Sequence, residues 1–561
     1  MADKGVSSAT AAPNFSPTAK KAYAIIRGME KPATDIYTFE DLRRGGFTYV
    51  DKTGMILPLA DLSIGKQFFL SRPRRFGKSL LISTLRALFE GRRELFKGLE
   101  IEPKWDWSRV WTVLHLDMGS CQAETVERLW DKIDGCLISE SDRLGVPLRP
   151  VRDVSRKFRH FIDDLAAKSP SEDGQIVLLV DEYDKPLLGH LSKPDVLRFR
   201  DALKEFYSVI KTMEAKQRFT FLTGVSKFSK VSVFSDLNNL TDLTMSPGAA
   251  TLLGYTHDEL RKFFPETLGK IGRANGRDAD WAFREVIKWY DGYKFEEDGE
   301  KVVNPVSFGC CARDGKFDSY WSKTAMTTFL TDALREHPLD FSTLGIDESE
   351  LEAYEPDNPR LVTLLYQTGY LTIKSFRQTG VRRKFDLCFP NLEVESSFLT
   401  ALAPIYAGLD PSRSSSFQFA AAEAILAGDV EGLVKALKGF FANIPYDLTD
   451  RQNEQMWQAI VYVVLKAIGI DVFAEVKTNE GRIDMTCETS DAVWLVEFKL
   501  DRPADEALAQ IERNNYAEKY DLAGKRVVRI GVAFSSEKRT IVDVRVAQAA
   551  PLGGGPVTVR R

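Results

Sequence analysis

Four short apolar runs alternate with amphipathic segments in the first half of the chain. The runs lie at residues 67–70, 112–116, 176–180 and 219–223. Uninterrupted apolar runs of this length are typical of strands that are buried on both faces of a parallel sheet. The segments between them repeat their apolar residues with the helical period. The pattern from about residue 66 to residue 245 therefore predicts a parallel α/β sheet covered by helices.

Two further patterns follow this segment. Residues 256–439 mostly repeat with the helical period, and a short strand is predicted at residues 370–374. From residue 450, a helix at residues 453–468 precedes a strand–hairpin–strand–helix–strand pattern that ends near Ile541, with its helix at residues 504–520. We therefore predict a multidomain α/β protein. Its predicted parts are a disordered lead-in (1–35), a parallel α/β domain (36–255), a mostly helical lid or connector (256–445), a second α/β domain (446–548) and a flexible tail (549–561).

Length and composition narrow the class of protein. At 561 residues the chain is too long for one hydrophobic core, and its 44% hydrophobic and 28% charged residues are ordinary for a globular protein. No apolar stretch approaches the roughly 18–20 residues of a membrane span, and the N-terminus lacks the pattern of a signal peptide. The six cysteines form no CxxC pair and no disulfide spacing. We therefore expect a cytoplasmic protein without a membrane segment.

Charge and histidine content limit the partners and metals. The net charge of −4 argues against a protein that simply coats nucleic acid, although local basic patches remain compatible with it. All five histidines lie at or before His337, and none belongs to a zinc-binding pattern. Any metal in the C-terminal third must therefore be held mainly by carboxylates.

The first candidate site follows the strand at residues 67–70. A loop there leads into Gly-Lys-Ser at the start of a predicted helix, which is the setting that a phosphate-binding loop requires. Backbone N–H groups and the helix dipole would face the anion, the lysine would neutralise phosphate charge, and the serine would bind Mg²⁺. The first glycine of the GxxxxGK[ST] pattern is replaced by Arg72, and Pro73 follows. The candidate phosphate-binding residues are Arg75, Phe76, Gly77, Lys78 and Ser79.

A second apolar strand completes this site. Residues 176–180 form an unbroken aliphatic run that ends in Asp181 and Glu182. This is the Walker B arrangement, in which Asp181 would hold Mg²⁺ and Glu182 would polarise the attacking water. The alternative is a core strand that merely ends in a charged turn. The two halves together predict binding of ATP and, less strongly, its hydrolysis.

Two details of this site stay open from the sequence. A strand that ends in Thr223 could place a polar sensor between the two halves, but an ordinary polar strand end explains the residue equally well. The arginine finger is not readable, and Arg74 and Arg75 are the arginines nearest to the phosphates along the chain.

The second candidate site is a hairpin near the C-terminus. A turn at residues 490–491 sets Asp484 directly opposite Glu497, so that both carboxylates can bind one divalent ion. Alternation along the strand places Lys499 on the same face as Glu497. Mg²⁺ at this position could activate water and stabilise charge on a scissile phosphate, with Lys499 orienting the nucleophile. The alternative is a solvated surface hairpin, which explains less well why these charges follow an apolar run.

Three further residues could extend this hairpin site. Glu454, on the preceding helix, could supply a third carboxylate, or it could be surface charge. Gln510 and Tyr516, on the following helix, could brace the site, although surface polarity is the commoner explanation.

The motifs in combination resemble a known family. Asp484 followed by Glu497-Phe-Lys499 resembles the PD-(D/E)XK nuclease superfamily, and the whole chain resembles bacterial AAA-ATPase-like proteins with a C-terminal domain of this superfamily. The resemblance implies a P-loop NTPase domain, a restriction-endonuclease-like domain and the arginine-rich form of the phosphate loop. The chain departs from the family pattern at Trp457-Gln458, where members often have Tyr-His. The other matching segments are residues 47–52, 72–80, 180–186, 223–230, 289–293, 304–306, 367–371, 390–394, 481–484, 510–511 and 516.

Three functional hypotheses follow. The leading one is an enzyme in which ATP binding and hydrolysis control Mg²⁺-dependent cleavage of nucleic acid, with DNA favoured over RNA as the partner. The second is an ATP-switched module that binds nucleic acid or a partner without cutting. The third is a nuclease that is indifferent to nucleotide. A homo-oligomer is compatible with the sequence but is not readable from it. Aromatic and basic residues at 289–294 could contact DNA, although core packing explains such aromatics more often.

Overall fold

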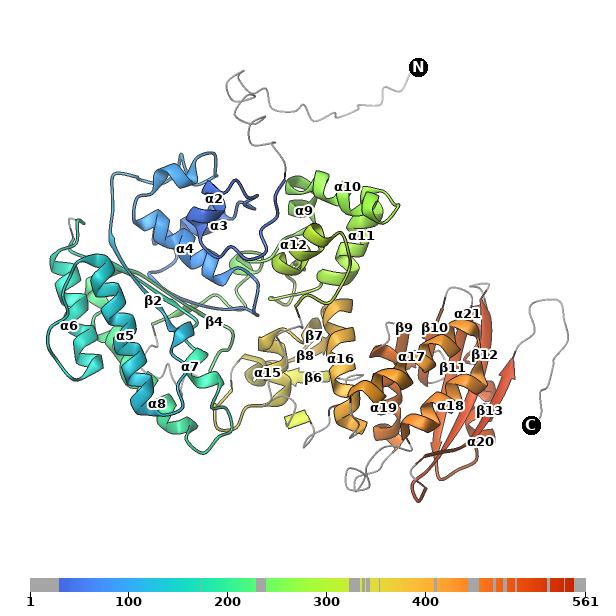
Figure 1. Ribbon diagram of the computed structural model, residues 1–561. Helices are drawn as coiled ribbons and strands as arrows, with labels where there is room; N and C mark the ends of the chain where they lie inside the picture. The colour runs from blue at the N-terminus through green and yellow to red at the C-terminus, as the bar shows by residue number, and fades with distance from the viewer. Residues whose placement is uncertain are drawn as a thin grey trace, which may run out of the picture.

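The chain folds around three sheets that follow one another along the sequence (Figure 1). The computed structural model describes residues 30–171, 173–228, 239–321, 333–334, 339, 344–352, 354–407, 411–441, 454–467, 471–477, 482–489, 492–521, 525–538 and 540–548. Residues 1–29 of the predicted lead-in and the predicted tail lie outside these ranges. Among the described residues, no helix combines the length and the apolar character needed to cross a lipid bilayer.

The first sheet is the parallel sheet that the apolar runs predict. Its strand order is β2-β3-β4-β1-β5, and every neighbouring pair is parallel. The strand β4 therefore lies between β1 and β3, where the carboxyl ends of all three meet at one edge. The two-residue β5 was not predicted, because it is too short to carry a hydrophobic period. The strands are β1 (Gln67–Ser71), β2 (Thr112–Asp117), β3 (Ile176–Asp181), β4 (Gln217–Gly224) and β5 (Thr241–Asp242).

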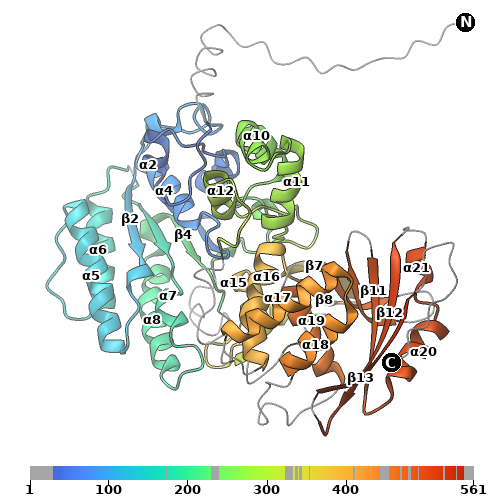
Figure 2. The same cartoon turned by 45° about the vertical axis from the view of Figure 1, so that its right-hand side comes forward.

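Helices cover both faces of this sheet (Figures 1 and 2). The helices α5, α6 and α8 pack together on one face, and α2 and α4 lie on the other. Thr125 and Asp153 begin α5 and α6 as side-chain caps, and Gly91, with a φ of 73°, follows the end of α4. The helices are α2 (Phe39–Arg44), α3 (Thr53–Ala60), α4 (Lys78–Phe89), α5 (Val126–Leu144), α6 (Val154–Ala167), α7 (Lys185–Leu188) and α8 (Val196–Thr212).

The middle of the chain is mostly helical, as predicted, but it contains a small antiparallel sheet with the order β6-β8-β7. The strand predicted at residues 370–374 begins two residues later and is longer, and its partner β8 was not predicted. Most of β7 is exposed, so it lacks the apolar alternation that marks a half-buried strand. The elements are α9 (His257–Phe263), α10 (Pro265–Ala274), α11 (Ala279–Tyr290), α12 (Pro305–Asp314), β6 (Leu344–Asp347), α14 (Glu348–Glu352), α15 (Leu361–Thr368), β7 (Thr372–Thr379), β8 (Arg382–Cys388) and α16 (Leu392–Ala407).

The aromatic residues considered for DNA contact lie in this region. Tyr290 and Tyr293 are buried, with 0% and 1% of their surface exposed. Tyr293 packs edge-on against the ring of Phe76, 4.7 Å between ring centroids. Core packing therefore explains both tyrosines, and neither presents a ring to a nucleic acid.

The third sheet has the order β13-β12-β11-β10-β9, with β11 and β12 parallel and the other pairs antiparallel. The helix α20 makes the crossover between the two parallel strands. Figure 2 shows α17, α18 and α19 on one face of this sheet and α20 on the other. The elements are α17 (Pro411–Ala427), α18 (Val430–Phe441), α19 (Glu454–Ala467), β9 (Asp471–Lys477), β10 (Arg482–Glu488), β11 (Ala492–Leu500), α20 (Ala504–Arg513), α21 (Glu518–Asp521), β12 (Arg526–Ser535) and β13 (Thr540–Gln548).

Two features of this last unit differ from the sequence pattern. The single helix predicted at residues 504–520 is wrong, because α20 ends at Arg513 and the chain turns through Asn515, whose φ is 42°. An asparagine adopts this left-handed conformation more readily than most residues. In addition, Ala421, Leu433 and Phe440 share one core cluster with Trp494 of β11. We therefore propose that the C-terminal domain begins near residue 411 and not at residue 446.

Candidate nucleotide and nuclease sites

The loop between β1 and α4, residues 72–77, is called the phosphate loop below. Its backbone takes the left-handed conformation at Arg75 and at Gly77, with φ of 68° and 97°. Such a conformation at a non-glycine residue costs on the order of 1–2 kcal/mol, and strain of this kind concentrates at binding sites. Gly77 begins α4 without a side-chain cap. The first N–H groups of α4 therefore remain available to an anion at the helix N-terminus.

Lys78 is held inside the phosphate loop. Its side chain is buried, and Nζ donates hydrogen bonds of 2.9 Å to the backbone oxygens of Arg72 and Pro73. Burial lowers the pKa of Lys78 to about 8, although the charges of Asp181 and Asp184 oppose this shift. A bound phosphate would supply the compensating negative charge that the buried ammonium group lacks.

Arg72, which stands where the phosphate-loop pattern has a glycine, has a structural position. Its guanidinium group is buried and donates to the backbone oxygens of Thr244, at 2.7 Å, and Ala249, at 2.9 Å. It also stacks over the ring of Phe295 at 4.1 Å from the centroid. The Arg72 side chain is therefore bound to the segment that follows β5. These contacts explain how the loop accommodates an arginine at this position.

The carboxyl edge of the first sheet is acidic. Asp181 ends β3, and the Ser79 hydroxyl lies close enough to its carboxyl group to favour the charged form, so the two predicted halves of the nucleotide site are adjacent. Burial raises the pKa of Asp181. Glu182 follows in a left-handed conformation, φ 50°, and lies against Gly119. Asp117 is the register partner of Asp181 and adds a third carboxylate that was not predicted. Its signal in the sequence was the same as that of Asp181, an aspartate at the end of an apolar run.

Thr223 lies between the two halves of the site. It lies one residue before the end of β4, opposite Leu70 of β1, and β4 runs between β1 and β3 as predicted. Its hydroxyl is buried and has no hydrogen-bond partner among the described residues. Next to it, the fully buried Asp184 accepts from the backbone N–H groups of Val225 and Ser226, at 3.1 and 2.7 Å. Asp184 thereby fixes the loop after β4, a role that needs contacts which the sequence does not display.

The hairpin of β10 and β11 has the predicted register. Met485 pairs with Val496, and the next pairs follow in step. The Asp484 N–H donates to Glu497 Oε2 at 3.4 Å, and the Phe498 N–H donates to Asp484 Oδ2 at 2.9 Å. The structure therefore brings the two carboxylates together across the strands.

Glu497 and Lys499 form a buried pair on this hairpin. Only 1% of Glu497 and 6% of Lys499 is exposed. Lys499 Nζ lies 3.3 Å from Glu497 Oε1 and donates to the backbone oxygen of Phe498 at 2.9 Å. Burial, with a further contribution from Asp484, raises the pKa of Glu497 to about 7. Two carboxylates in this setting form an all-oxygen donor set with excess negative charge, which fits a hard divalent cation such as Mg²⁺.

The helix α20 and the turn that follows it support the pair. The Gln510 side-chain amide donates to Glu497 Oε1, so Gln510 braces the carboxylate. The Tyr516 hydroxyl is buried and donates to the Arg482 backbone oxygen at 2.8 Å, two residues before Asp484. Both residues therefore make the direct contacts that the bracing interpretation requires. Glu454 begins α19, but its side chain and those of Trp457 and Gln458 lie outside the described residues.

Comparison with known proteins bears on both sites. Residues 33–234 match the family described as "Predicted AAA-ATPase", and residues 452–544 match the PD-(D/E)XK nuclease superfamily. A relative from Azotobacter chroococcum mcd 1, described as "Uncharacterized protein in vnfD 5'region", is 37% identical over 521 residues, which cover 90% of this chain and 97% of the relative. The chain belongs to the AAA-ATPase-like proteins with a PD-(D/E)XK domain. The two matches cover the AAA-ATPase-like module around β1–β4 and the PD-(D/E)XK module around β9–β12.

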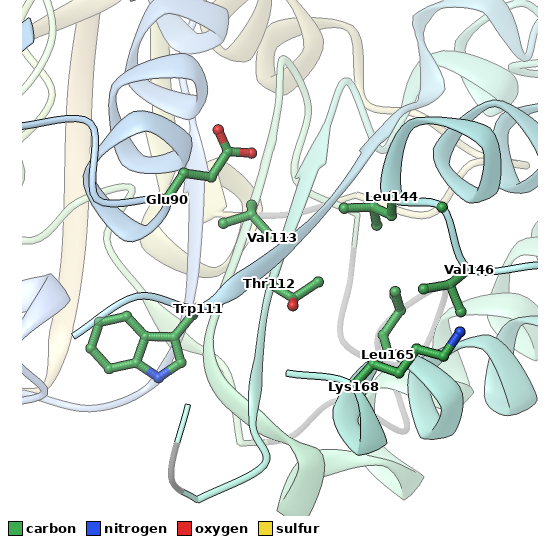
Figure 3. Close-up of a pocket in the computed structure, with 9 residues that line it drawn as sticks. Glu90, Trp111, Thr112, Val113, Leu144, Val146, Leu165 and Lys168 are labelled. Atoms are coloured by element: carbon green, nitrogen blue, oxygen red, sulfur yellow. The ribbon is translucent and has the colours of Figure 1, made fainter. Parts of the chain in front are cut away.

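The AAA-ATPase-like module has cavities at several places, and one of about 700 Å³ is lined by Gln122, Pro186 and His190. A second cavity, about 370 Å³, lies at the amino-terminal end of β2, between Thr112, Leu144 and Lys168 (Figure 3). It is therefore remote from the phosphate loop and is not the nucleotide site. A third, about 70 Å³, adjoins Gly77 and Leu80 and is mostly apolar.

Proposed function

We propose that this AAA-ATPase-like protein binds and hydrolyses ATP and that its PD-(D/E)XK module cleaves nucleic-acid phosphodiester bonds with Mg²⁺. The observation that carries the nuclease half is the group formed by the half-buried Asp484 with the buried Glu497 and Lys499 on β10 and β11. The buried charge of such a group is costly to fold unless it serves binding or catalysis, and strongly shifted pKa values cluster at functional sites.

The nucleotide half of the proposal rests on the phosphate loop. The N–H groups of Arg75, Phe76 and Gly77 and the ammonium group of Lys78 would bind the phosphates. The ring of Phe76 is buried against Tyr293, so its backbone and not its ring would bind the phosphates. Ser79 and Asp181 would hold Mg²⁺ with the nucleotide, and Glu182 would orient the attacking water.

We propose that the small cavity beside Gly77 receives the base of the nucleotide. Tyr49, Val50, Leu80 and Pro305 line it, and such walls favour a flat apolar ring. Its volume of about 70 Å³ holds only about two waters, so these walls must separate when a base enters. Base binding would thus draw on both the N-terminal segment and the middle of the chain.

The nuclease half assigns each side chain a task. Asp484 and Glu497 would hold Mg²⁺, with Glu454 as the proposed third carboxylate. The ion supplies Lewis-acid polarisation of the phosphate and a more acidic bound water. Lys499 would orient the nucleophile and offset charge on the phosphate, while Gln510 keeps the Glu497 carboxylate in place.

The test is cleavage of plasmid DNA, single-stranded DNA and RNA with Mg²⁺. We compare the wild type with Asp484→Ala and Lys78→Ala, and with Glu512→Ala, an exposed residue of α20, as the matched control. We expect product from the wild type and the control, and a loss of about 100-fold or more for Asp484→Ala. Equal cleavage by all four proteins would contradict the proposal.

Other results of the same assay separate the alternatives. Nucleotide-dependent binding without product under Mg²⁺ or Mn²⁺ would favour a non-cleaving binding module. Full cleavage by Lys78→Ala would favour a nuclease that is independent of nucleotide.

We propose DNA as the main partner. We also propose a cytoplasmic location, and the lack of disulfide spacing among the six cysteines supports this location. Sedimentation with and without ATP tests whether copies assemble.

A further inference from the structure

The phosphate loop is held by the middle of the chain through contacts that ATP chemistry alone does not require. Arg75 Nη1 donates to the Tyr320 backbone oxygen at 2.7 Å, and the Trp321 indole N–H donates to the Arg74 backbone oxygen at 3.4 Å. A Cβ on Gly369 would lie 2.6 Å from Pro73, so this glycine permits close approach to the loop. Residues 320–321 therefore form a strap across the phosphate loop.

A buried carboxylate holds this strap. Glu393 is 0% exposed, and its Oε1 accepts a hydrogen bond from the Trp321 backbone N–H. Burial raises the pKa of Glu393 to about 7, and the charge of Arg75 is among the influences that oppose this shift. Glu393 thus lies at the point where the strap and the phosphate-loop arginine come together. Nothing in the proposed chemistry on ATP uses this carboxylate.

The start of α16 is fixed in place around Glu393. The Asn391 side chain accepts from the Val394 N–H at 3.0 Å and donates to the Asp291 backbone oxygen at 2.9 Å. Gly292, with a φ of 106°, lies so close to Pro390 that any Cβ there would clash with its oxygen. A displacement of the strap therefore acts on a helix end that has little freedom to absorb it.

From this point α16 runs to the PD-(D/E)XK module. Glu395, two residues beyond Glu393, pairs with Lys466 of α19 at 3.4 Å, and both side chains are mostly buried. Further along, the Thr400 hydroxyl donates to the Ala467 backbone oxygen at 3.4 Å. The two helices pack side by side in Figures 1 and 2. The far end of α19 begins at Glu454, the proposed third carboxylate.

We propose that Glu393 is a positioning residue that couples nucleotide at the phosphate loop to the nuclease module through α16 and α19. The γ-phosphate of a bound nucleotide attracts the Arg75 guanidinium away from the Tyr320 oxygen, which loosens the strap. Glu393 passes this change to α16, and the pair of Glu395 and Lys466 passes it to α19. The proposal rests on the proposed ATP binding. Such coupling is demonstrated only when nucleotide binding measurably changes the distant helix, because contact between the elements does not by itself establish it.

Calorimetry first gives the affinity of the full chain for a non-hydrolysable ATP analogue. Amide hydrogen exchange of the full chain is then measured with and without Mg²⁺ and this analogue. The reporting segments are residues 392–407 and 454–467. The variants are Glu393→Gln, which keeps the acceptor for Trp321 but removes the charge, and Glu395→Gln, which removes the charge that pairs with Lys466. Glu423→Gln, an exposed residue of α17, is the matched control.

In the wild type and the control, we expect nucleotide to change exchange in both segments by fivefold or more. Glu393→Gln should bind the analogue within about threefold of the wild type and lose the change in both segments. Glu395→Gln should keep the change in α16 and lose it in α19, and it serves by itself if Glu393→Gln does not fold. Binding without any exchange change in the wild-type α19, or a full change in both variants, would overturn the coupling alone. No binding by the wild type would overturn the ATP proposal as well.

Discussion

At the scale of single residues, the two candidate sites and Glu393 of α16 share one property, which is the burial of a charged side chain. Lys78 is buried without a carboxylate within ion-pair distance among the described residues, and Glu497 and Glu393 are buried with raised pKa values. Such groups lower stability unless a ligand or partner compensates them. We infer that these residues are kept for function rather than for stability.

The first prediction concerns Lys78. Lys78→Met keeps the length of the side chain and removes the charge, so ATP binding should weaken by about 100-fold or more, while the melting temperature without nucleotide should fall by no more than about 3 °C. Calorimetric titration and thermal unfolding measure the two quantities. A large loss of stability with unchanged ATP affinity would show that the ammonium group is structural.

The second prediction concerns the pH dependence of stability at Glu393. Its pKa is about 7 in the folded protein and near 4.5 otherwise, so the folded state disfavours the charged form. This contribution to the free energy of unfolding is complete below about pH 4.5 and is lost as pH rises through 7. The wild type should therefore lose more stability than Glu393→Gln between pH 5.5 and about pH 8.

Urea unfolding at several pH values, followed by tryptophan fluorescence, measures this difference, and Glu423→Gln provides the control for a glutamate that is exposed. If the wild type and Glu393→Gln lose stability in parallel, the carboxyl group of Glu393 does not titrate in this range.

At the scale of elements, the sequence predicted the parts whose signal is local. The strands β1 and β3 are uninterrupted apolar runs, and the register of β10 with β11 follows from a short turn and period-two alternation. The strands β5 and β8 were missed because one has two residues and the other is mostly polar. Asp184 and Glu393 were missed as members of a site, because their importance comes from contacts between distant segments. Asp117 was missed although it ends an apolar run, as Asp181 does.

The third prediction tests one such contact between elements. Gly292→Ala places a Cβ 1.8 Å from the Pro390 backbone oxygen, in a left-handed conformation, and should destabilise the middle of the chain by about 3 kcal/mol or more. The matched control is Gly276→Ala, which also has a left-handed φ but no atom within 4 Å, and which should cost only about 1–2 kcal/mol. Urea midpoints of the two variants compare the costs, and equal midpoints would mean that the close approach to Pro390 is not required.

At the scale of the whole molecule, the sequence predicted an α/β module at each end, but not which helices belong to which module. The helices α17 and α18 have apolar faces that fit a helical connector equally well. Only the core cluster that they share with Trp494 and Phe534 shows that they help to form the core of the third sheet. A sequence cannot display this choice, because an apolar helix face does not specify the surface that covers it.

The fourth prediction follows from this core. A fragment of residues 411–548 should fold with a cooperative thermal transition, whereas a fragment of residues 446–548 should not, because it exposes the face that α17 and α18 cover. Circular dichroism and binding of a hydrophobic dye distinguish the two. Cooperative unfolding of the shorter fragment would place the domain boundary where the sequence pattern put it.

The partners that hold the Arg72 side chain come later in the sequence, and this order has a consequence while the protein is being synthesised. Its guanidinium group contacts the backbone of Thr244 and Ala249 and the ring of Phe295, and the neighbouring Arg75 contacts Tyr320. All four partners leave the ribosome well after the phosphate loop itself. A nascent chain that ends before residue 244 therefore has the complete phosphate-binding motif but lacks these partners of Arg72, and one that ends before residue 320 still lacks the partner of Arg75. We expect the phosphate loop to reach its final shape only after the middle of the chain has been made.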